Sequence, residues 1–416
     1  MLHKKTDNVG SIYGIPVKCV DMIEDISNSY VIVAVMGDAS KQIYKNLIEK
    51  YICQKEKIYV ISFDEYLHIR KLVPDLIYEV RNELKSLSDI VKRDVKYIIP
   101  NKKDKERYSK EFGILIQNKE ILTERIFALT KDLDEDSRFE VCRILDRLHK
   151  LIEGKTICFS KQEFEDLSNR KFEYEQNIFK LSDDIYYARG FYFPNNKPSF
   201  SGFFDEEWVK LIYNLDYINN KDVIDAGAFI GDTPLIFSKY TNGHIHSFDA
   251  DEQNYKILQR TAQLNPDKRI VPVYYALTDF NGEVKFSLGC GRDTGSEKEC
   301  GNGVGSIQQV NNVNKSNIIV SVPAITIDKY VSDNNLKIGL IKADVEGAEQ
   351  QMLLGAEQTI RSQKPILYIS IYHSIDDFFN IKTWIESLDL NYKFKIHRTV
   401  VAHSFMEETM LLCLPE

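Results

Sequence analysis

The second half of the chain alternates between short apolar runs and longer amphipathic or polar stretches. Apolar runs separated by helical patterns indicate buried strands of a mostly parallel, doubly wound sheet. The last two runs are joined by only a short polar connection, so we expect them to be antiparallel neighbours at the edge of the sheet. The runs are Val223–Ala226, His244–Asp249, Ile270–Tyr275, Ile338–Ala343, Pro365–Ile371, Lys393–His397 and Thr409–Leu414.

A predicted hairpin interrupts this alternation after the third run. Its strands are Glu283–Leu288 and Ile318–Val322, and the glycine-rich segment Gly289–Asn317 lies between them. Long loops that are rich in glycine often carry function, so this segment is a candidate lid over an acceptor site. It also contains Cys290 and Cys300, but no nearby histidine or cysteine completes a four-ligand zinc site, and we predict no metal.

The first half of the chain predicts two further regions. Tyr30–Met36 and Lys57–Phe63 have the pattern of strands with a helix between them, which indicates a small α/β unit over residues 1–72. Residues 73–195 have mainly helical spacing and are predicted to connect this unit to a domain over 196–416. One helix is expected to start at the capping box Ser137–Glu140 and to bury a stripe formed by Phe139, Cys142, Leu145, Leu148 and Ile152.

Composition narrows the class of protein. The chain has 416 residues, of which 43% are hydrophobic, and this supports two or three globular domains. The net charge of −8 disfavours nucleic acid as a partner. The longest apolar run, Tyr30–Met36, is too short to cross a bilayer, and no secretory signal is recognisable. Seven scattered cysteines favour reduced thiols and a cytoplasmic location.

The loop after the first strand of the sheet carries the most specific chemistry. It reads Asp225-Ala226-Gly227-Ala228-Phe229-Ile230-Gly231-Asp232 and leads into a helix. Gly227 allows a close approach of the backbone to a ligand, and Gly231 allows close packing of the helix on the strand. A dehydrogenase would place glycine where Asp225 stands, because a carboxylate repels a pyrophosphate. S-adenosylmethionine has no pyrophosphate and carries two positive charges, so Asp225 favours this cofactor over NAD.

Two later strand ends complete the predicted cofactor site. Asp249 ends the second strand, 18 residues after Gly231, where an acidic residue can accept hydrogen bonds from both ribose hydroxyls. Ala250 follows it, and Ala276 ends the third strand, where an adenine would lie. For Asp225 and Asp249 the alternative interpretation is that each only caps a helix. We therefore predict as cofactor-binding residues Asp225, Gly227, Ala228, Phe229, Ile230, Gly231, Asp232, Asp249, Ala250 and Ala276.

Four stretches of the chain, between about residues 200 and 416, resemble the FkbM family of methyltransferases. The resemblance implies a seven-stranded class I methyltransferase fold with the last strand antiparallel, and usually O-methylation of a hydroxyl, often on a sugar of a glycan or glycoconjugate. The chain has Asp249-Ala250 where the family often has Glu-Pro, which shortens the predicted ribose contact by one methylene. The stretches are Val223–Asp232, Phe248–Asp251, Ile341–Glu349 and Ser370–His373.

Methyl transfer to a hydroxyl needs a group that assists deprotonation. His373 is our first candidate, because histidine titrates near neutral pH. Asp344 is the second, either as a base or as the residue that orients His373, and Glu346 follows at the start of a helix. For His373 the alternative is a packed or surface residue. For Glu346 the alternative role is stabilisation of the helix N-terminus.

Other functions stay open at this point. The acceptor is alternatively an amine, a peptide or a lipid-linked molecule, or the chain is a catalytically silent protein that binds S-adenosylmethionine and serves as a scaffold. Residues 1–72 resemble a truncated Rossmann-like module. No glycine-rich loop precedes the strand candidate Tyr30–Met36, so we expect this module to be degenerate. The N-terminal regions are candidates for forming a homo-oligomer.

Overall fold

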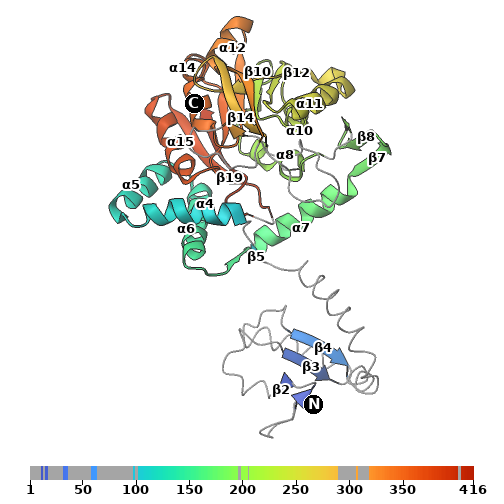
Figure 1. Ribbon diagram of the computed structural model, residues 1–416, viewed down its shortest axis with the longest axis vertical. Helices are drawn as coiled ribbons and strands as arrows, with labels where there is room; N and C mark the ends of the chain where they lie inside the picture. Colours follow the sequence, from blue (N-terminus) through green and yellow to red (C-terminus); the bar gives the residue numbers. More distant parts are fainter. Residues whose placement is uncertain are drawn as a thin grey trace. The chain divides into compact units, whose positions relative to one another are not determined.

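The computed structural model describes residues 11–12, 15–16, 31–35, 58–62, 97–98, 102–194, 198–204, 206–288, 306–307, 318–401 and 404–416. The chain divides into two compact units, Met1–Lys96 and Tyr97–Glu416, and each is described here by itself (Figure 1). The boundaries predicted at residues 72 and 195 remain a prediction.

The first unit contributes four short strands. β1 (Ser11–Ile12) and β2 (Ile15–Pro16) pair antiparallel, and β3 (Val31–Val35) pairs in parallel with β4 (Ile58–Ser62). The two longer strands lie where the apolar runs predicted them. The helix expected between them lies outside the described residues, and the Rossmann-like character of this unit stays a prediction.

The second unit is built on a seven-stranded sheet with the order β12-β11-β10-β17-β18-β20-β19. β20 is antiparallel to both of its neighbours, and the other described pairs are parallel. The predicted mostly parallel sheet with an antiparallel last strand is therefore confirmed, and each strand overlaps one predicted run. The strands are β10 (Asp222–Ala226), β11 (Ile245–Phe248), β12 (Ile270–Val273), β17 (Ile338–Ala343), β18 (Ile366–Ser370), β19 (Tyr392–Arg398) and β20 (Thr409–Pro415).

The central strands are continuous apolar runs because both faces of the sheet are covered. Every residue of β17 and β18 is buried, as expected for inner strands of a parallel sheet. The helices that alternate with the strands bury their apolar faces in the same core. They are α10 (Asp232–Phe237), α11 (Glu252–Leu264), α12 (Ile327–Asn334), α13 (Glu349–Leu354), α14 (Glu357–Gln363) and α15 (Ile375–Ser387), with the 3-10 turn η5 (Pro266–Lys268).

A second, smaller sheet contains the predicted hairpin. Its order is β13-β16-β14-β15, and β14 pairs antiparallel with β16, so the hairpin is confirmed. Of the candidate lid between them, only the residues of β15 are described. The strands are β13 (Ala276–Leu277), β14 (Gly282–Leu288), β15 (Ser306–Ile307) and β16 (Ile318–Ile325).

Helices dominate the segment between the first unit and the large sheet, and part of this segment packs on the sheet domain. Helix α5 contacts α15, and α6 contacts β19. The helices are α4 (Lys102–Leu115), α5 (Lys119–Thr130), α6 (Glu135–Ile152) and α7 (Lys161–Gln176). Short elements follow or separate them: β5 (Tyr97–Ile98), β6 (Ile157–Cys158), β7 (Ile178–Ser182), β8 (Ile185–Ala188), β9 (Phe191–Pro194), α8 (Phe200–Phe204), α9 (Glu207–Lys210) and the 3-10 turn η4 (Leu215–Tyr217).

A buried ionic cluster joins this helical segment to the edge of the sheet. Glu163 at the start of α7 is paired with Arg147 of α6 and with Arg398 of β19. Although burial opposes it, the two guanidinium groups hold the pKa of Glu163 well below its usual range. The same carboxylate accepts the backbone N–H of Ser160 at 2.7 Å and closes the capping box there.

The prediction for α6 was wrong in its start and in its buried face. The helix begins at Glu135, with the Asp134 carboxylate accepting the N–H of Ser137 at 2.9 Å. The Ser137 hydroxyl instead accepts the N–H of Ile396, also at 2.9 Å. Phe139 is 62% exposed, because contact with β19 turns a neighbouring face inward. That face comprises Val141, Ile144, Leu148 and Leu151.

The aromatic residues that lead into the sheet domain pack as core. The rings of Phe191 and Phe193 both meet that of Phe203 edge to face, with centroids 6.0 and 5.0 Å apart. All three side chains are buried. Among the described residues, no helix combines the length and the apolar character needed to cross a membrane.

Candidate active site

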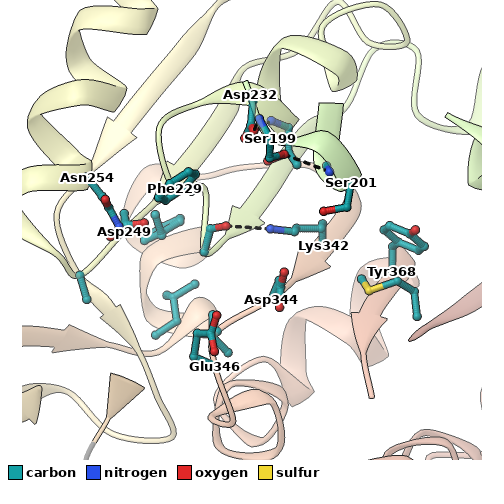
Figure 2. A pocket seen from close by; sticks show the side chains of 18 of the residues that line it. Ser199, Ser201, Phe229, Asp232, Asp249, Asn254, Lys342, Asp344, Glu346 and Tyr368 are labelled. Atoms are coloured by element: carbon teal, nitrogen blue, oxygen red, sulfur yellow. Dashed lines mark hydrogen bonds between the residues drawn. The ribbon is translucent and has the colours of Figure 1, made fainter. Parts of the chain in front are cut away.

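A cavity of about 320 Å³ lies at the carboxyl ends of β10, β11 and β17 (Figure 2). The strand order reverses between β10 and β17, and ligands of open α/β sheets bind outside such a switch point. Its wall includes Phe229, Asp249, Asn254, Asp344, Glu346 and Glu408. Figure 2 shows that Asp249 and Asn254 lie toward one end of the view and Tyr368 toward the other, with Asp344 between them.

Position 227 requires glycine for two reasons, its backbone conformation and the close approach of a neighbouring residue. Its φ is +76°, and a Cβ atom at this position would lie 1.8 Å from the carbonyl oxygen of Asp344. The N–H groups of Gly227 and Ala228 both donate to the carbonyl of Phe248, at 3.0 and 2.8 Å. The loop is therefore fixed between the ends of β11 and β17, in contact with the chain on both sides.

The second glycine of the loop has the packing role expected from the sequence. Gly231 has a φ of +91°, and a Cβ there would lie 2.8 Å from the side chain of Leu258 in α11. Ile230, whose carbonyl accepts the hydroxyl of Thr261 at 2.6 Å, is buried. Phe229, in contrast, is 38% exposed and lines the cavity. The loop thus presents one apolar side chain to a ligand and keeps its neighbours in the core.

Asp225 lies behind the loop and does not line the cavity. Its side chain is fully buried, with one oxygen accepting the hydroxyl of Thr233 at 2.7 Å and the other 3.2 Å from the ammonium of Lys342. Lys342 also donates to the carbonyl of Gly227 at 2.7 Å, as Figure 2 shows. Burial raises the pKa of Asp225, while Lys342 opposes this shift. Asp225 therefore positions the loop through Lys342, and its direct contact with a ligand stays a prediction.

Asp232 joins two segments of the chain at the wall of the cavity. Its carboxylate accepts the backbone N–H of Ser199 at 2.7 Å and that of Thr233 at 3.0 Å. The hydroxyl of Ser199 in turn accepts the N–H of Gly202 at 3.0 Å. The segment that precedes the sheet domain is thereby tied to the start of α10, and Ser199, Gly202 and Asp232 all line the cavity.

Asp249 faces the cavity from the end of the second strand, as the sequence predicted. Its carboxylate accepts the N–H of Asp251 at 2.8 Å, and burial raises its pKa to about 7. Asn254 stands beside it with a buried side-chain oxygen that has no hydrogen-bond partner. Ala250 and Ala276 also line this end. This end of the cavity therefore has two polar groups that can accept hydrogen bonds, and it also has small apolar surfaces.

His373 lies behind the cavity wall and is surrounded by carboxylates. Its Nδ1 is 3.0 Å from Glu349, and its Nε2 is 3.3 Å from Glu346 and 3.6 Å from Asp344. Although burial opposes it, Glu349 and Glu346 raise the pKa of His373 well above its usual value. The surrounding carboxylates therefore favour the imidazolium form of His373, and Asp344 and Glu346 are the members of this cluster that reach the cavity.

Glu349 is the centre of this cluster. It is fully buried, and its carboxylate accepts the N–H groups of Val345 at 2.8 Å and Gly347 at 3.1 Å and the hydroxyl of Ser370 at 2.9 Å.

The same cluster has the spacing of a metal site. Among the described residues, Asp344, Glu349 and His373 bring ligand atoms within 4.8 Å of one another. Both oxygens of Glu349 are already engaged by N–H and O–H donors, so the positive partner that suits this cluster is the imidazolium of His373. The expectation of no metal stays a prediction.

Sequence reasoning missed several residues of the wall, among them Asn254, Lys342, Tyr372 and Glu408. Lys342 is the lone charge inside an apolar run, which is itself a signal. Tyr372 donates its hydroxyl to Asp344 at 3.0 Å. Glu408 immediately precedes β20, and because that strand is antiparallel, its beginning lies at the carboxyl edge of the sheet. The predicted antiparallel strand would have sufficed to place Glu408 there.

Comparisons with known proteins find one family model and distant solved structures. The model of the methyltransferase FkbM domain matches residues 225–396. No curated protein sequence matches the chain. A methyltransferase FkbM from Methylobacillus flagellatus KT is 13% identical, with 92% of this chain and 90% of that chain covered and a TM-score of 0.42.

Two fibrillarins are more distant. That of Aeropyrum pernix, in complex with natively bound S-adenosyl-L-methionine, is 12% identical, with 50% and 72% of the two chains covered and a TM-score of 0.28. That of Methanococcus jannaschii, a pre-rRNA processing protein, is 14% identical, with 59% and 84% covered and a TM-score of 0.31. All three scores are low, so the fold assignment rests on the strand order itself.

Proposed function

Because residues 225–396 belong to the methyltransferase FkbM family, we propose that the chain is an S-adenosylmethionine-dependent O-methyltransferase. The acceptor in this proposal is a hydroxyl group, of a sugar in a glycan or glycoconjugate. One observation supports this proposal most strongly. The cavity at the switch point has hydrogen-bond acceptors at one end, and the Asp344 carboxylate, which accepts the Tyr372 hydroxyl, lies farther along.

The residues of the cavity fit this cofactor. Asp249 and the unpartnered oxygen of Asn254 are suited to accept hydrogen bonds from ribose hydroxyls. Phe229, Ala250 and Ala276 offer apolar surface for an adenine. Lys342, the one cation in the described wall, is already bound by Asp225 and the carbonyl of Gly227, so no side-chain cation of that wall is free to pair with a pyrophosphate. When bound, S-adenosylmethionine supplies a methyl group on a positively charged sulfur.

The proposed roles at the other end differ from the first expectation. His373 was the leading candidate for the proton acceptor, but an imidazolium that is already protonated cannot take up another proton. We assign to it the positioning of Glu346 and Asp344, whose carboxylates it contacts. Asp344 lines the cavity and is oriented by the Tyr372 hydroxyl, so it is placed to receive the hydrogen bond of an acceptor hydroxyl.

Asp344→Asn is expected to lower turnover by about 10²- to 10⁴-fold, because the amide cannot take part in deprotonation. Binding of S-adenosylhomocysteine should change by less than about 3-fold, since Asp344 is remote from the ribose end in this account. Transfer of a radiolabelled methyl group to a panel of free sugars and methyl glycosides gives turnover, and calorimetry gives binding. Asp376→Asn is the control, because its side chain is 65% exposed on α15. Full turnover of Asp344→Asn would remove Asp344 from the mechanism.

Cofactor binding is expected to depend on the ionisation of Asp249. Its pKa of about 7 means that the carboxylate becomes fully ionised only above neutral pH, so affinity for S-adenosylhomocysteine should increase between pH 5.5 and 8. Asp249→Asn should weaken binding by about 10- to 100-fold at pH 8 and flatten this dependence. Asp267→Asn, with a side chain 71% exposed, is the control. An unchanged affinity in Asp249→Asn would exclude the ribose contact.

One observation also favours an amine as the acceptor. Asp344, Glu346 and Glu408 add three carboxylates to those of Asp232, Asp249 and Asp251 in the described wall, and these would attract an ammonium as well as a hydroxyl. Including amino sugars in the acceptor panel separates N-methylation from O-methylation. Binding of S-adenosylmethionine without transfer to any acceptor would instead favour a catalytically silent scaffold.

A further inference from the structure

We propose that Tyr108 and Glu111 of helix α4 are positioning residues of the active site. In this proposal they fix the loop between β18 and α15, so that the Tyr372 hydroxyl of this loop can orient the Asp344 carboxylate. The inference rests on the proposed function for its effect on methyl transfer. The fixing of the loop is a property of the protein alone and is tested without an acceptor.

The loop between β18 and α15 carries two side chains that meet the Asp344 carboxylate. The Tyr372 hydroxyl donates to it at 3.0 Å, and the Nε2 of His373 lies 3.6 Å from the same oxygen. Residues 371–374 belong neither to the strand nor to the helix, so no ladder of helix or sheet hydrogen bonds fixes their backbone. The orientation of Asp344 therefore depends on what else holds this loop.

Tyr108 holds the loop at Tyr372. Its hydroxyl donates to the backbone carbonyl of Tyr372 at 2.6 Å. The Arg107 guanidinium donates to the same hydroxyl at 2.7 Å, and a charged donor strengthens the bond that the hydroxyl gives in turn. The Tyr108 side chain is fully buried, and its ring packs against that of Phe405 with centroids 6.3 Å apart. A buried ring with little freedom to move thus sets the position of the Tyr372 carbonyl.

Glu111 holds the loop where α15 begins. Its carboxylate accepts the N–H of Ile375, the first residue of that helix, at 2.8 Å. The first N–H groups of a helix have no partner within the helix, and the helix dipole also favours a carboxylate there. Glu111 follows Tyr108 by three positions, so both side chains lie on one face of α4, which contacts α15 (Figure 1). One helix face therefore holds the loop at two points.

The place of these bonds separates them from other contacts of the helical segment. Arg125 of α5, for example, pairs with Asp376 on the surface of α15, where the aspartate side chain is 65% exposed. Tyr108 instead bonds to the backbone of the residue whose hydroxyl meets Asp344. The helix α4 is thus part of the site, whereas the sequence predicted for residues 73–195 only a connecting role.

The first arm of the test follows the loop directly and needs no acceptor. A fluorotyrosine placed at position 372 of the full chain reports on its surroundings through its fluorine NMR resonance. Tyr108→Phe removes one hydroxyl, and we expect this resonance to shift or broaden because the loop has lost a bond. An unchanged resonance in Tyr108→Phe would overturn the proposal whatever the chain catalyses.

Tyr392→Phe is the matched control for Tyr108→Phe. The Tyr392 side chain is also buried, and its hydroxyl donates to a backbone carbonyl, that of Pro365, at 2.7 Å. Pro365 precedes β18 at the end of the strand opposite to the cavity. We therefore expect a loss of Tm comparable with that of Tyr108→Phe, an unchanged resonance at position 372 and unchanged turnover. A resonance that responds equally to both variants would show a general loss of packing and would contradict the proposal.

The second arm measures methyl transfer to the same panel of free sugars and methyl glycosides. Tyr108→Phe should lower turnover by about 10- to 100-fold, because a small misplacement of a positioning group is costly, and it should change S-adenosylhomocysteine binding by less than about 3-fold. Tyr108→Phe combined with Tyr372→Phe should lose little beyond Tyr372→Phe alone, since Tyr108 acts through Tyr372. Losses that multiply in the double variant would refute positioning through this hydroxyl.

The third arm tests the bond from Ile375 to Glu111. Glu111→Ala should lower turnover by about 10-fold, whereas Glu111→Gln, whose amide oxygen can accept the same N–H, should restore most of it. Equal losses in the two variants would remove Glu111 from the proposal.

The arms keep this inference apart from the proposed function. Full turnover in Tyr108→Phe beside an active natural chain would refute the positioning role and leave the proposed function standing. No turnover in the natural chain would count against the proposed function, while the resonance at position 372 still decides whether α4 fixes the loop.

Discussion

Gly227→Ala is expected to abolish detectable binding of S-adenosylmethionine and to lower the free energy of unfolding by about 2 to 5 kcal/mol. The left-handed backbone costs a residue with a side chain about 1 to 2 kcal/mol, and overpacking adds about 1 to 3 kcal/mol. The new Cβ would lie 1.8 Å from the Asp344 carbonyl, so either the loop or the end of β17 has to move. The loop and the end of β17 both carry residues that line the cavity. Calorimetry measures the binding, and urea unfolding measures the free energy of unfolding.

The variant Gly154→Ala separates the effect of the backbone conformation from the effect of the close contact. Gly154 has a similar φ of +68°, but a Cβ there would meet no atom within 4 Å. We expect a loss of about 1 kcal/mol and unchanged cofactor binding, because only the backbone preference is affected. Equal losses in the two variants would show that the contact with Asp344 does not matter.

Glu349→Ala is expected to lower the free energy of unfolding by about 3 to 5 kcal/mol, as for other buried ion pairs that lose one partner. The substitution leaves the His373 imidazolium, two N–H groups and the Ser370 hydroxyl without their shared acceptor.

The pH dependence of this loss follows from both partners. His373 and Glu349 neutralise each other, which lowers the pKa of Glu349 and raises that of His373. Their mutual stabilisation is therefore complete between about pH 5 and 6.5, and it declines when the carboxyl group protonates at lower pH or the imidazolium deprotonates at alkaline pH.

Glu357→Ala provides the comparison for Glu349. Glu357 forms a salt bridge with Arg361 at 2.8 Å on the surface of α14, with a side chain 39% exposed. Such pairs contribute less than about 1 kcal/mol. If Glu349→Ala unfolds at the same urea concentration as Glu357→Ala, the cluster around His373 is not the stabilising unit described here.

The sheet could be predicted because its strands are buried on both faces. Such strands are continuous apolar runs, and Ile338–Ala343 was predicted with its observed bounds. Other runs, such as Pro365–Ile371, differ from the observed strand by one residue at each end. The antiparallel last strand followed from the length of the connection before it. The need for glycine at 227 and 231 also followed from local sequence, because the turn itself demands it, but the close neighbour of Gly227 is the Asp344 carbonyl, where a ligand was predicted.

Residues whose partners are distant in sequence could not be assigned in this way. Asp225 has the same appearance in the sequence whether it faces a ligand or Lys342, and only the pairing of β10 with β17 decides between them. The buried face of α6 depends on β19, whose position a helical pattern does not contain. His373 looked like a base because its carboxylate neighbours come from a separate loop and raise its pKa only after folding.

The central claim is that this cavity holds S-adenosylmethionine, and calorimetric titration of the full chain tests it most directly. S-adenosylmethionine and S-adenosylhomocysteine should each bind with one site per chain and compete with each other, whereas NAD should give no binding heat. Asp249 and Asn254 account for binding at the ribose end, and the discrimination against the pyrophosphate of NAD follows from the engagement of Lys342 by Asp225. Binding of NAD, or no binding of either S-adenosyl compound, would contradict the account.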